Sequence, residues 1–459
     1  MTSPVLAGRA RVRALVGRAV ARIALVSAAF GAAVACAASG AEENRSEPAP
    51  DPGDGGNVIA DAGTPENGGA ADADASFEPP VCSAAGWCRT PLLEDDLWFK
   101  DVWLVADRAF ALVTSNTVGT KVLEWDTDHW SFIDDKPQLT VRMTPSNVWA
   151  PDKDEVFYSV NDYSGLLPGE GTYGVFVYRG KRPTPPATDW TWTRSRIECP
   201  PLQPSPQVWG TSSSDVYLAA CGKTFHLDEG KSVDAGGDPD DGDAAADAGA
   251  SAWTVEYVDD DPVPPISFNG VTGTGPDDIW FVGYRGSSAC TVLVHKTAAG
   301  YEKIVDGTPG PAKSCLERSG LPTITGAFQN QNFHAIAKDR FVGVRYSNLP
   351  GNEIVKVAPD GGGGWAIAYA SPAPSMNVLL GSIWGTSEED LWMIASSSTA
   401  SGGFVLRGAN VWSDAGTYSF STLALNGAPN TRVLEKIRGT SNENLWAVGN
   451  QRAYHKNTP

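Results

Sequence analysis

The chain has 459 residues, and its composition excludes several classes of protein. The 49 glycines, 33 prolines and 16 tryptophans are typical of many short strands joined by turns. Only 19% of the residues are charged and no run of twenty apolar residues occurs, which excludes a coiled coil and a multi-span membrane protein. The net charge of −19 argues against a nucleic-acid partner, because a surface that binds phosphates needs Lys and Arg.

The N-terminal residues 1–35 have the pattern of a signal peptide. Their basic residues are all arginine, and they precede the apolar stretch 23–35, which is too short to span a bilayer. The run Ala33-Val34-Ala35-Cys36 resembles a bacterial lipobox, in which the cysteine carries the lipid. An ordinary secretory signal, with Cys36 incidental, is the alternative. We expect a lipoprotein signal peptide at 1–35 and lipidation of Cys36.

Two segments are too polar to fold. Residues 36–80 consist almost wholly of Ala, Gly, Pro and acidic residues, which predicts a disordered acidic tether behind the anchor. Residues 234–250 repeat this composition. Calcium binding is the alternative for 234–250, but the segment lacks the spacing and the terminal Glu of an EF-hand loop. We therefore expect a disordered surface loop there.

Six cysteines remain once Cys36 is set aside. An even number of cysteines in an exported protein predicts disulfides rather than free thiols. Zinc is the other interpretation, but the chain has no CxxC pair and no Cys/His cluster, so no metal site is expected. We expect neighbours in the sequence to pair, which gives Cys82 with Cys88, Cys199 with Cys221, and Cys290 with Cys315.

One segment recurs along the chain. VWGTSSSDVYLAA at 208–220 has the same design as IWGTSEEDLWMIA at 383–395 and IRGTSNENLWAVG at 437–449. Further copies, some weaker, bring the number to seven, at intervals of about 55 residues, which is the period of a β-propeller. The copies begin at Val102, Val148, Val208, Val271, Ile324, Ile383 and Ile437.

Each copy is typical of a β-hairpin, in which two apolar strands flank a tight turn that ends at a polar residue. Apolar segments downstream, such as 223–227 and 292–296, supply a third strand, and segments that contain Trp supply a fourth. The seventh copy lacks a fourth strand, whereas 86–91, around Trp87, precedes the first hairpin as an unmatched strand. The expected fold is an all-β, seven-bladed β-propeller at 81–459, with four-stranded blades, closed by pairing of its N- and C-terminal strands.

The lipobox-like start, the acidic tether and the W-G-T-S-x-x-D-hydrophobic-W repeats together resemble the propeller lipoproteins common in myxobacteria. More distantly, residues 82–459 resemble BNR-type and photosystem-assembly-factor-like propellers. The resemblance implies the fold of the blades. It implies nothing about a substrate, because one propeller fold hosts lectins, scaffolds and hydrolases.

No catalytic constellation is evident. The boxes of a sialidase are absent from the sequence, as are the vicinal cysteines of a quinoprotein dehydrogenase. Three histidines fall at one repeat position, where other copies have Glu124 and Arg407, which indicates a structural role. These are His226, His295 and His455; the remaining two, His129 and His334, are isolated. We expect no catalytic, cofactor-binding or metal-binding residue and no cofactor.

Acidic residues recur at the end of the hairpin turn. An acidic rim that holds a cation is one interpretation, and turn chemistry, in which the carboxylate accepts backbone N–H groups, is the other. We favour turn chemistry. The residues are Glu155, Asp215, Asp278 and Asp390.

These features predict a binding or scaffold protein, monomeric and lipid-anchored, that recruits an unknown protein or glycan through loops on one propeller face. Ala37, rather than Asp, after Cys36 favours the outer membrane, facing the periplasm or the cell surface. The alternative is a hydrolase that acts on extracellular polysaccharide. An axial pocket with two carboxylates roughly 5 to 10 Å apart would favour the hydrolase.

Overall fold

The structure is a computed structural model that describes residues 82–134, 143–162, 174–200, 204–227, 253–261, 264–286, 290–318, 320–346, 352–372, 376, 378–397 and 402–457. The expected signal peptide, Cys36, the tether at 36–80 and the loop at 234–250 lie outside the described residues. Within the described part of the chain, no helix has the length and apolar character needed to cross a membrane.

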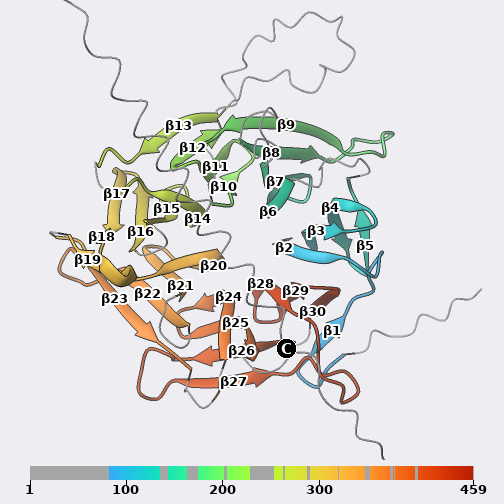
Figure 1. Ribbon diagram of the computed structural model, residues 1–459. Helices are drawn as coiled ribbons and strands as arrows, with labels where there is room; N and C mark the ends of the chain where they lie inside the picture. The colour runs from blue at the N-terminus through green and yellow to red at the C-terminus, as the bar shows by residue number, and fades with distance from the viewer. Residues whose placement is uncertain are drawn as a thin grey trace, which may run out of the picture. The chain divides into compact units, whose positions relative to one another are not determined.

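The described residues form seven four-stranded antiparallel sheets, which are the blades of a β-propeller (Figure 1). The first two blades contain β2 (Trp98–Val105), β3 (Arg108–Ser115), β4 (Gly119–Asp126), β5 (His129–Phe132), and β6 (Met143–Asp152), β7 (Glu155–Asp162), β8 (Gly174–Lys181), β9 (Thr191–Glu198). The next two contain β10 (Gln207–Ser212), β11 (Asp215–Ala220), β12 (Lys223–Leu227), β13 (Trp253–Val258), and β14 (Ser267–Gly275), β15 (Asp278–Arg285), β16 (Cys290–Thr297), β17 (Gly300–Val305). Blades five and six contain β20 (Ala327–Ala337), β21 (Arg340–Tyr346), β22 (Glu353–Pro359), β23 (Trp365–Ala370), and β24 (Val378–Ser387), β25 (Asp390–Ser397), β26 (Gly403–Ala409), β27 (Thr417–Ser421).

The seventh blade is built from both ends of the chain. It contains β28 (Leu434–Ser441), β29 (Asn444–Gly449) and β30 (Arg452–Lys456), and its outer strand is β1 (Trp87–Arg89). Strand β1 pairs with β30 in the register Trp87↔Lys456. The Trp87 side chain is fully buried, and its Nε1 donates a hydrogen bond to Ser421 Oγ of blade six at 2.9 Å. The predicted closure is therefore confirmed.

The inner strand of each blade contacts the inner strand of the next, from β2 through β6, β10, β14, β20 and β24 to β28, which contacts β2 again. The second strand of each blade is covered on both faces by the blades on either side. For this reason β11 and β29 are buried at every position except the first, and their sequences are continuous apolar runs rather than alternating ones.

The fifth repeat copy lies nine residues or so further along the chain than expected. We expected its hairpin to begin at Ile324, but β20 and β21 pair with Ala335 opposite Phe341, the register in which Gly385 opposes Leu391 in blade six. The segment Ile324-Thr-Gly imitates the repeat, yet its first residue is used elsewhere: the buried Ile324 accepts a hydrogen bond from the backbone N–H of Thr291 in blade four. The expectation for this copy was wrong.

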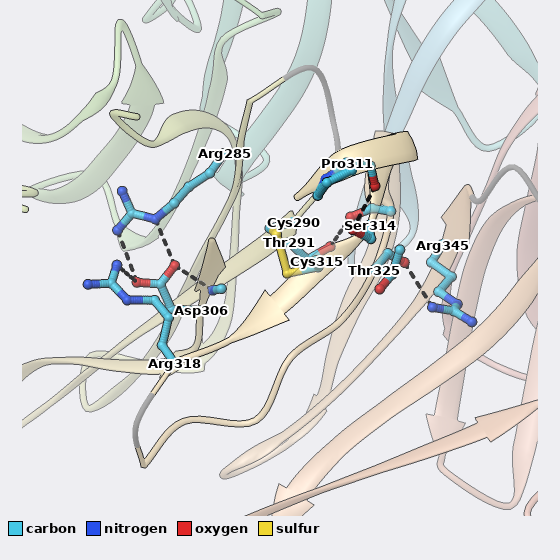
Figure 2. The surroundings of a disulfide bond; sticks show 12 residues. Arg285, Cys290, Thr291, Asp306, Pro311, Ser314, Cys315, Arg318, Thr325 and Arg345 are labelled. Atoms are coloured by element: carbon cyan, nitrogen blue, oxygen red, sulfur yellow. Dashed lines mark hydrogen bonds and ion pairs between the residues drawn. A yellow bond between two sulfur atoms is a disulfide. The ribbon is translucent and has the colours of Figure 1, made fainter. Parts of the chain in front are cut away.

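The three predicted disulfides are confirmed: Cys82–Cys88, Cys199–Cys221 and Cys290–Cys315. The last of these ties a small hairpin, β18 (Gly307–Pro309) and β19 (Cys315–Glu317), to the start of β16 in blade four (Figure 2). Figure 2 also shows Asp306, just before this hairpin, between the side chains of Arg285 and Arg318.

Candidate functional site

One register position recurs on the inner strand of every blade. It follows the first aliphatic residue of the repeat, and it opposes the same position of the second strand in every blade. Four blades have Trp there and three have a different residue. The seven residues, in blade order, are Trp103, Trp149, Trp209, Thr272, His334, Trp384 and Arg438.

Three of these tryptophans, Trp149, Trp209 and Trp384, pack on the glycine of the next blade, whereas Trp103 donates a hydrogen bond to the backbone oxygen of Ala150 in the next blade. A Cβ at Gly210 would lie 2.9 Å from the Trp149 ring, and one at Gly273 would lie 2.5 Å from the Trp209 ring. The Trp-Gly pair of the repeat is therefore a contact between blades: a blade that carries both residues, such as blade three with Trp209 and Gly210, supplies a ring to one neighbour and a space to the other.

A cavity of about 270 Å³ lies among the inner strands and is lined by residues from all seven of them. Its aromatic wall comes from Trp103, Trp209 and Trp384, and its charged groups are Asp101 of β2 and Arg438 of β28. Small ligand sites are of this kind, mostly apolar with a few polar groups that fix orientation. We call it the axial cavity.

Asp101 and Arg438 are both buried at the junction between the first and last blades, with side chains 1% and 9% exposed. Asp101 Oδ2 accepts a hydrogen bond from the backbone N–H of Val148 at 3.2 Å. Asp101 Oδ1 lies 3.9 Å from Arg438 Nε, and neither of these two atoms has a hydrogen-bond partner among the described residues. Burial raises the pKa of Asp101 above its ordinary value, against the opposing influence of Arg438 and Lys436.

Two more titratable groups surround this pair. Lys436, also on β28, is buried, and burial lowers its pKa to about 7 even though Asp101 favours its charged form. His334 lines the axial cavity, with its ring 6.1 Å from that of Trp384. Burial, followed by the charge of Arg438, lowers the pKa of His334 to about 3, so its imidazole is neutral at physiological pH.

The structure places the site residues that the sequence singled out in different parts of the fold. His334, expected to be isolated, is brought into the axial cavity, whereas Arg438 and Asp101 were not singled out at all. The signal for Arg438 was present: it replaces Trp in the seventh copy, Ile437-Arg438-Gly439, where the sixth has Ile383-Trp384-Gly385. A residue that departs from the repeat at this inner-strand position is a candidate for a functional role.

The three repeat-equivalent histidines lie on third strands and pack on aromatic rings of second strands, two of them stacked. The ring centroids are 4.1 Å apart for His295 and Trp280, and 4.5 Å apart for His455 and Trp446. His226 packs on Tyr217 with the ring centroids 4.6 Å apart, but the two rings are tilted by 34°. The fifth histidine, His129 on β5, is exposed beside Asp128.

The acidic residues at the hairpin turn bond to these same third strands. His226 Nε2 lies 3.0 Å from Asp215 Oδ1, and His295 Nε2 lies 2.7 Å from Asp278 Oδ1. In blade six the guanidinium of Arg407 makes two hydrogen bonds of 2.7 Å to Asp390 and thereby lowers the pKa of that carboxyl. Glu155 pairs with Arg179 in the same manner.

These partners differ from the expected ones. We expected the turn amides to donate to the acids, but the Thr of the G-T pair donates instead, from Thr211 to Asp215 and from Thr274 to Asp278. This explains why Thr and Asp recur four residues apart. The acids are part of a network within the blade that joins its first, second and third strands.

One group of side chains in the described residues has the spacing of metal ligands: Asp278, His295 and Asp339. Asp278 Oδ1, however, already accepts hydrogen bonds from His295, from Trp280 Nε1 at 3.1 Å and from the backbone N–H of Asp339 at 3.1 Å. Burial would raise the pKa of Asp278, but the hydrogen bonds from His295 and Thr274 hold it below its usual value. The group is accounted for by the network of blade four, joined by a backbone N–H from the turn between β20 and β21 of blade five.

The axial cavity has one carboxylate, that of Asp101, among its described lining residues. Glycoside hydrolysis by the usual route needs a pair. The arrangement of Arg438, Asp101 and three indole rings is suited to holding a ligand.

No protein-family model and no curated protein matches the sequence. Among solved structures, YCF48 from Cyanidioschyzon merolae is 12% identical, with a TM-score of 0.47, over 82% of this chain and 99% of that protein. The fungal lectin of Aleuria aurantia, a six-bladed β-propeller, is 10% identical, with a TM-score of 0.37, over 72% of this chain and 95% of the lectin. Oligopeptidase B from Leishmania major is 10% identical, with a TM-score of 0.39, and this chain covers 53% of it. Each likeness is one of fold.

Proposed function

We propose that the protein is a binding module, anchored to the bacterial outer membrane through a lipid on Cys36, and that an end group of its ligand enters the axial cavity. The observation that carries the proposal is the axial cavity itself, which three Trp side chains line together with a buried Arg438 whose Nε is unpaired among the described residues. A volume of about 270 Å³ is small for a ligand site, which favours a single unit of a larger protein or glycan ligand.

The anchor is supported by the sequence alone. The arginine-rich start, the apolar stretch 23–35 and Ala33-Val34-Ala35-Cys36 together favour a lipid-modified N-terminus. In Cys36→Ser the modification is impossible, so the protein should move from the membrane fraction to the soluble or secreted fraction. A variant that stays in the membrane would contradict the anchor and leave the binding proposal untouched.

The binding site can be tested by filling it. Leu104 lines the axial cavity and is partly exposed, so Leu104→Trp should occupy the space without displacing a buried side chain. Leu93→Trp, at a surface position that is 43% exposed, is the matched control. Labelled full-length protein in detergent is applied to arrays of glycans and peptides.

We expect Leu104→Trp to lose the ligands that the wild type and Leu93→Trp retain. If Leu104→Trp keeps every ligand at wild-type strength, the binding surface lies elsewhere on the molecule.

A further inference from the structure

Arg438 occupies a position of the repeat at which most other blades have an aromatic residue. Four of the seven equivalent inner-strand positions are Trp, and each of these Trp side chains contacts the next blade. The Arg438 side chain is 9% exposed and its guanidinium carbon lies 5.8 Å from the centroid of the Trp103 ring. A guanidinium in this position costs desolvation that an indole would not.

Nothing among the described residues hydrogen-bonds to Nε of this guanidinium. The nearest acid, Asp101, approaches to 3.9 Å, which is an ion pair but too long for a hydrogen bond. The other oxygen of Asp101 is engaged by the backbone N–H of Val148. Arg438, which lines the axial cavity, therefore has a buried donor without a partner among the described residues, and such buried donors are normally satisfied.

The charges around the axial cavity limit which ligand can accept a hydrogen bond from Arg438. Asp101 in its ionised form opposes Arg438 and Lys436, and His334 is neutral, so with Asp101 ionised these four groups carry at most one net positive charge. A dianion such as phosphate would exceed this charge in a buried site, whereas a monoanion would match it. A carboxylate is planar and accepts a fork of two N–H groups from a guanidinium.

We infer that the axial cavity binds a small carboxylate monoanion through Arg438. This inference rests on the proposed function and narrows its ligand to an end group that bears a carboxylate. Trp103, Trp209 and Trp384 enclose the remainder of that group, and Asp101 limits the charge that the site accepts.

The test uses pairs of probes that differ only in the carboxylate. Methyl β-glucuronoside is compared with methyl β-glucoside, and N-acetylglycine with N-acetylglycinamide, by calorimetric titration of the full-length protein in detergent. The two pairs separate an acidic sugar from a peptide end as the source. We expect a carboxylate probe to bind and its uncharged twin to bind at least 10-fold more weakly, the loss of one charge-assisted hydrogen bond.

Arg438→Gln should lower the affinity for the carboxylate probe by roughly 10- to 100-fold and leave the weak binding of the uncharged probe unchanged. Arg438→Lys, which keeps the charge, should restore part of the affinity. Arg340→Gln, at a partly exposed arginine paired with Glu388, is the matched control and should bind as the wild type does. Thermal unfolding of each variant shows whether it is folded.

The inference is overturned if no carboxylate probe binds, if the members of a pair bind equally, or if folded Arg438→Gln binds as the wild type does. These results are distinct from failure of the proposed function. Suppose that a neutral ligand from the arrays no longer binds Leu104→Trp but still binds Arg438→Gln. This result would support the proposed binding function and contradict the inference that the ligand bears a carboxylate.

Discussion

At the scale of single residues, the Trp-Gly pair of the repeat is explained by contacts between blades. The ring of Trp209 lies where a side chain on Gly273 would be, and the ring of Trp384 lies 3.0 Å from a Cβ placed on Gly439. The Trp and the Gly of the pair are adjacent in sequence, but they contact different blades: the Trp contacts the next blade, and the Gly contacts the preceding one. Packing at this density leaves no room for a methyl group.

Gly273→Ala should therefore destabilise the propeller. Its Cβ would lie 2.5 Å from both the backbone oxygen of Asp278 and the Trp209 ring, and overpacking of this kind costs about 1–3 kcal/mol. Gly275→Ala, two residues along the same strand, is the matched control, because no atom lies within 4 Å of its Cβ. Urea unfolding measures both free energies, and equal values would show that the Trp-Gly contact does not limit the residue at 273.

A second residue-scale prediction concerns His455, which stacks on Trp446 and bonds through Nε2 to Asn444 Oδ1 at 2.9 Å. Burial lowers its pKa from 6.5 to about 4. Between these values the unfolded chain binds the proton and the folded one does not, so the free energy of unfolding falls as the pH drops from 6.5 to 4, by on the order of 1–3 kcal/mol.

His455→Gln keeps a donor for Asn444 and removes this titration. Its free energy of unfolding should depend less on pH than that of the wild type between pH 6.5 and 4, as measured by urea unfolding at several pH values. The same replacement at the exposed His129 controls for the removal of an imidazole as such. A wild-type pH profile in His455→Gln would show that this histidine does not couple folding to protons.

At the scale of the elements, the hydrogen-bond network inside a blade accounts for most of the repeat. A Thr at the end of the inner strand, an acid at the start of the second strand and a basic residue on the third strand fix three strands to one another, as Thr274, Asp278 and His295 do. Where His is replaced by Arg407, the same acid position is kept. Turn chemistry alone would not have required the third strand.

The inner hairpins could be predicted from sequence because their pattern is local. The turn, the acid and the apolar runs lie within about a dozen residues, and this was sufficient for blade number and for closure. The fifth copy was misplaced because Ile324-Thr-Gly has the right residue types, and only the pairing of β20 with β21 distinguishes it from the true hairpin.

The axial cavity could not be predicted, because its residues are brought together by ring closure rather than by any local pattern. Asp101 and Arg438 stand at opposite ends of the repeat array and meet only when the last blade contacts the first. The disulfides were easier to predict, since each joins cysteines that are close in sequence. What the sequence offered for the cavity was the departure of Arg438 from the Trp of other copies; the same departure at His334 is seen only in the corrected register of blade five.

At the scale of the whole molecule, the seventh blade makes the ring depend on both ends of the folded part of the chain. Strand β1 supplies Trp87, which is fully buried and lies edge-on to Trp392 of blade six, with ring centroids 6.2 Å apart. The next residue but two, Thr90, donates to the backbone oxygen of Ala453 at 3.2 Å and accepts a hydrogen bond from Trp130 Nε1 of blade one at 3.1 Å. One short segment thus joins the last blade to both of its neighbours.

A chain that starts at Pro91 should therefore be less stable than one that starts at Cys82, although both contain every inner hairpin. The shorter chain loses the Trp87 side chain, whose burial alone is worth about 3–5 kcal/mol on removal, and exposes the edge of β30 to other molecules. Thermal unfolding and light scattering compare the two, and we expect the shorter chain to unfold at a lower temperature and to associate. Trp87→Ala in the longer chain separates the lost side chain from the lost strand, because it should lower stability without exposing the edge. Equal unfolding temperatures for the two chains would show that the ring is held by its inner strands alone, and that β1 covers the last blade without closing it.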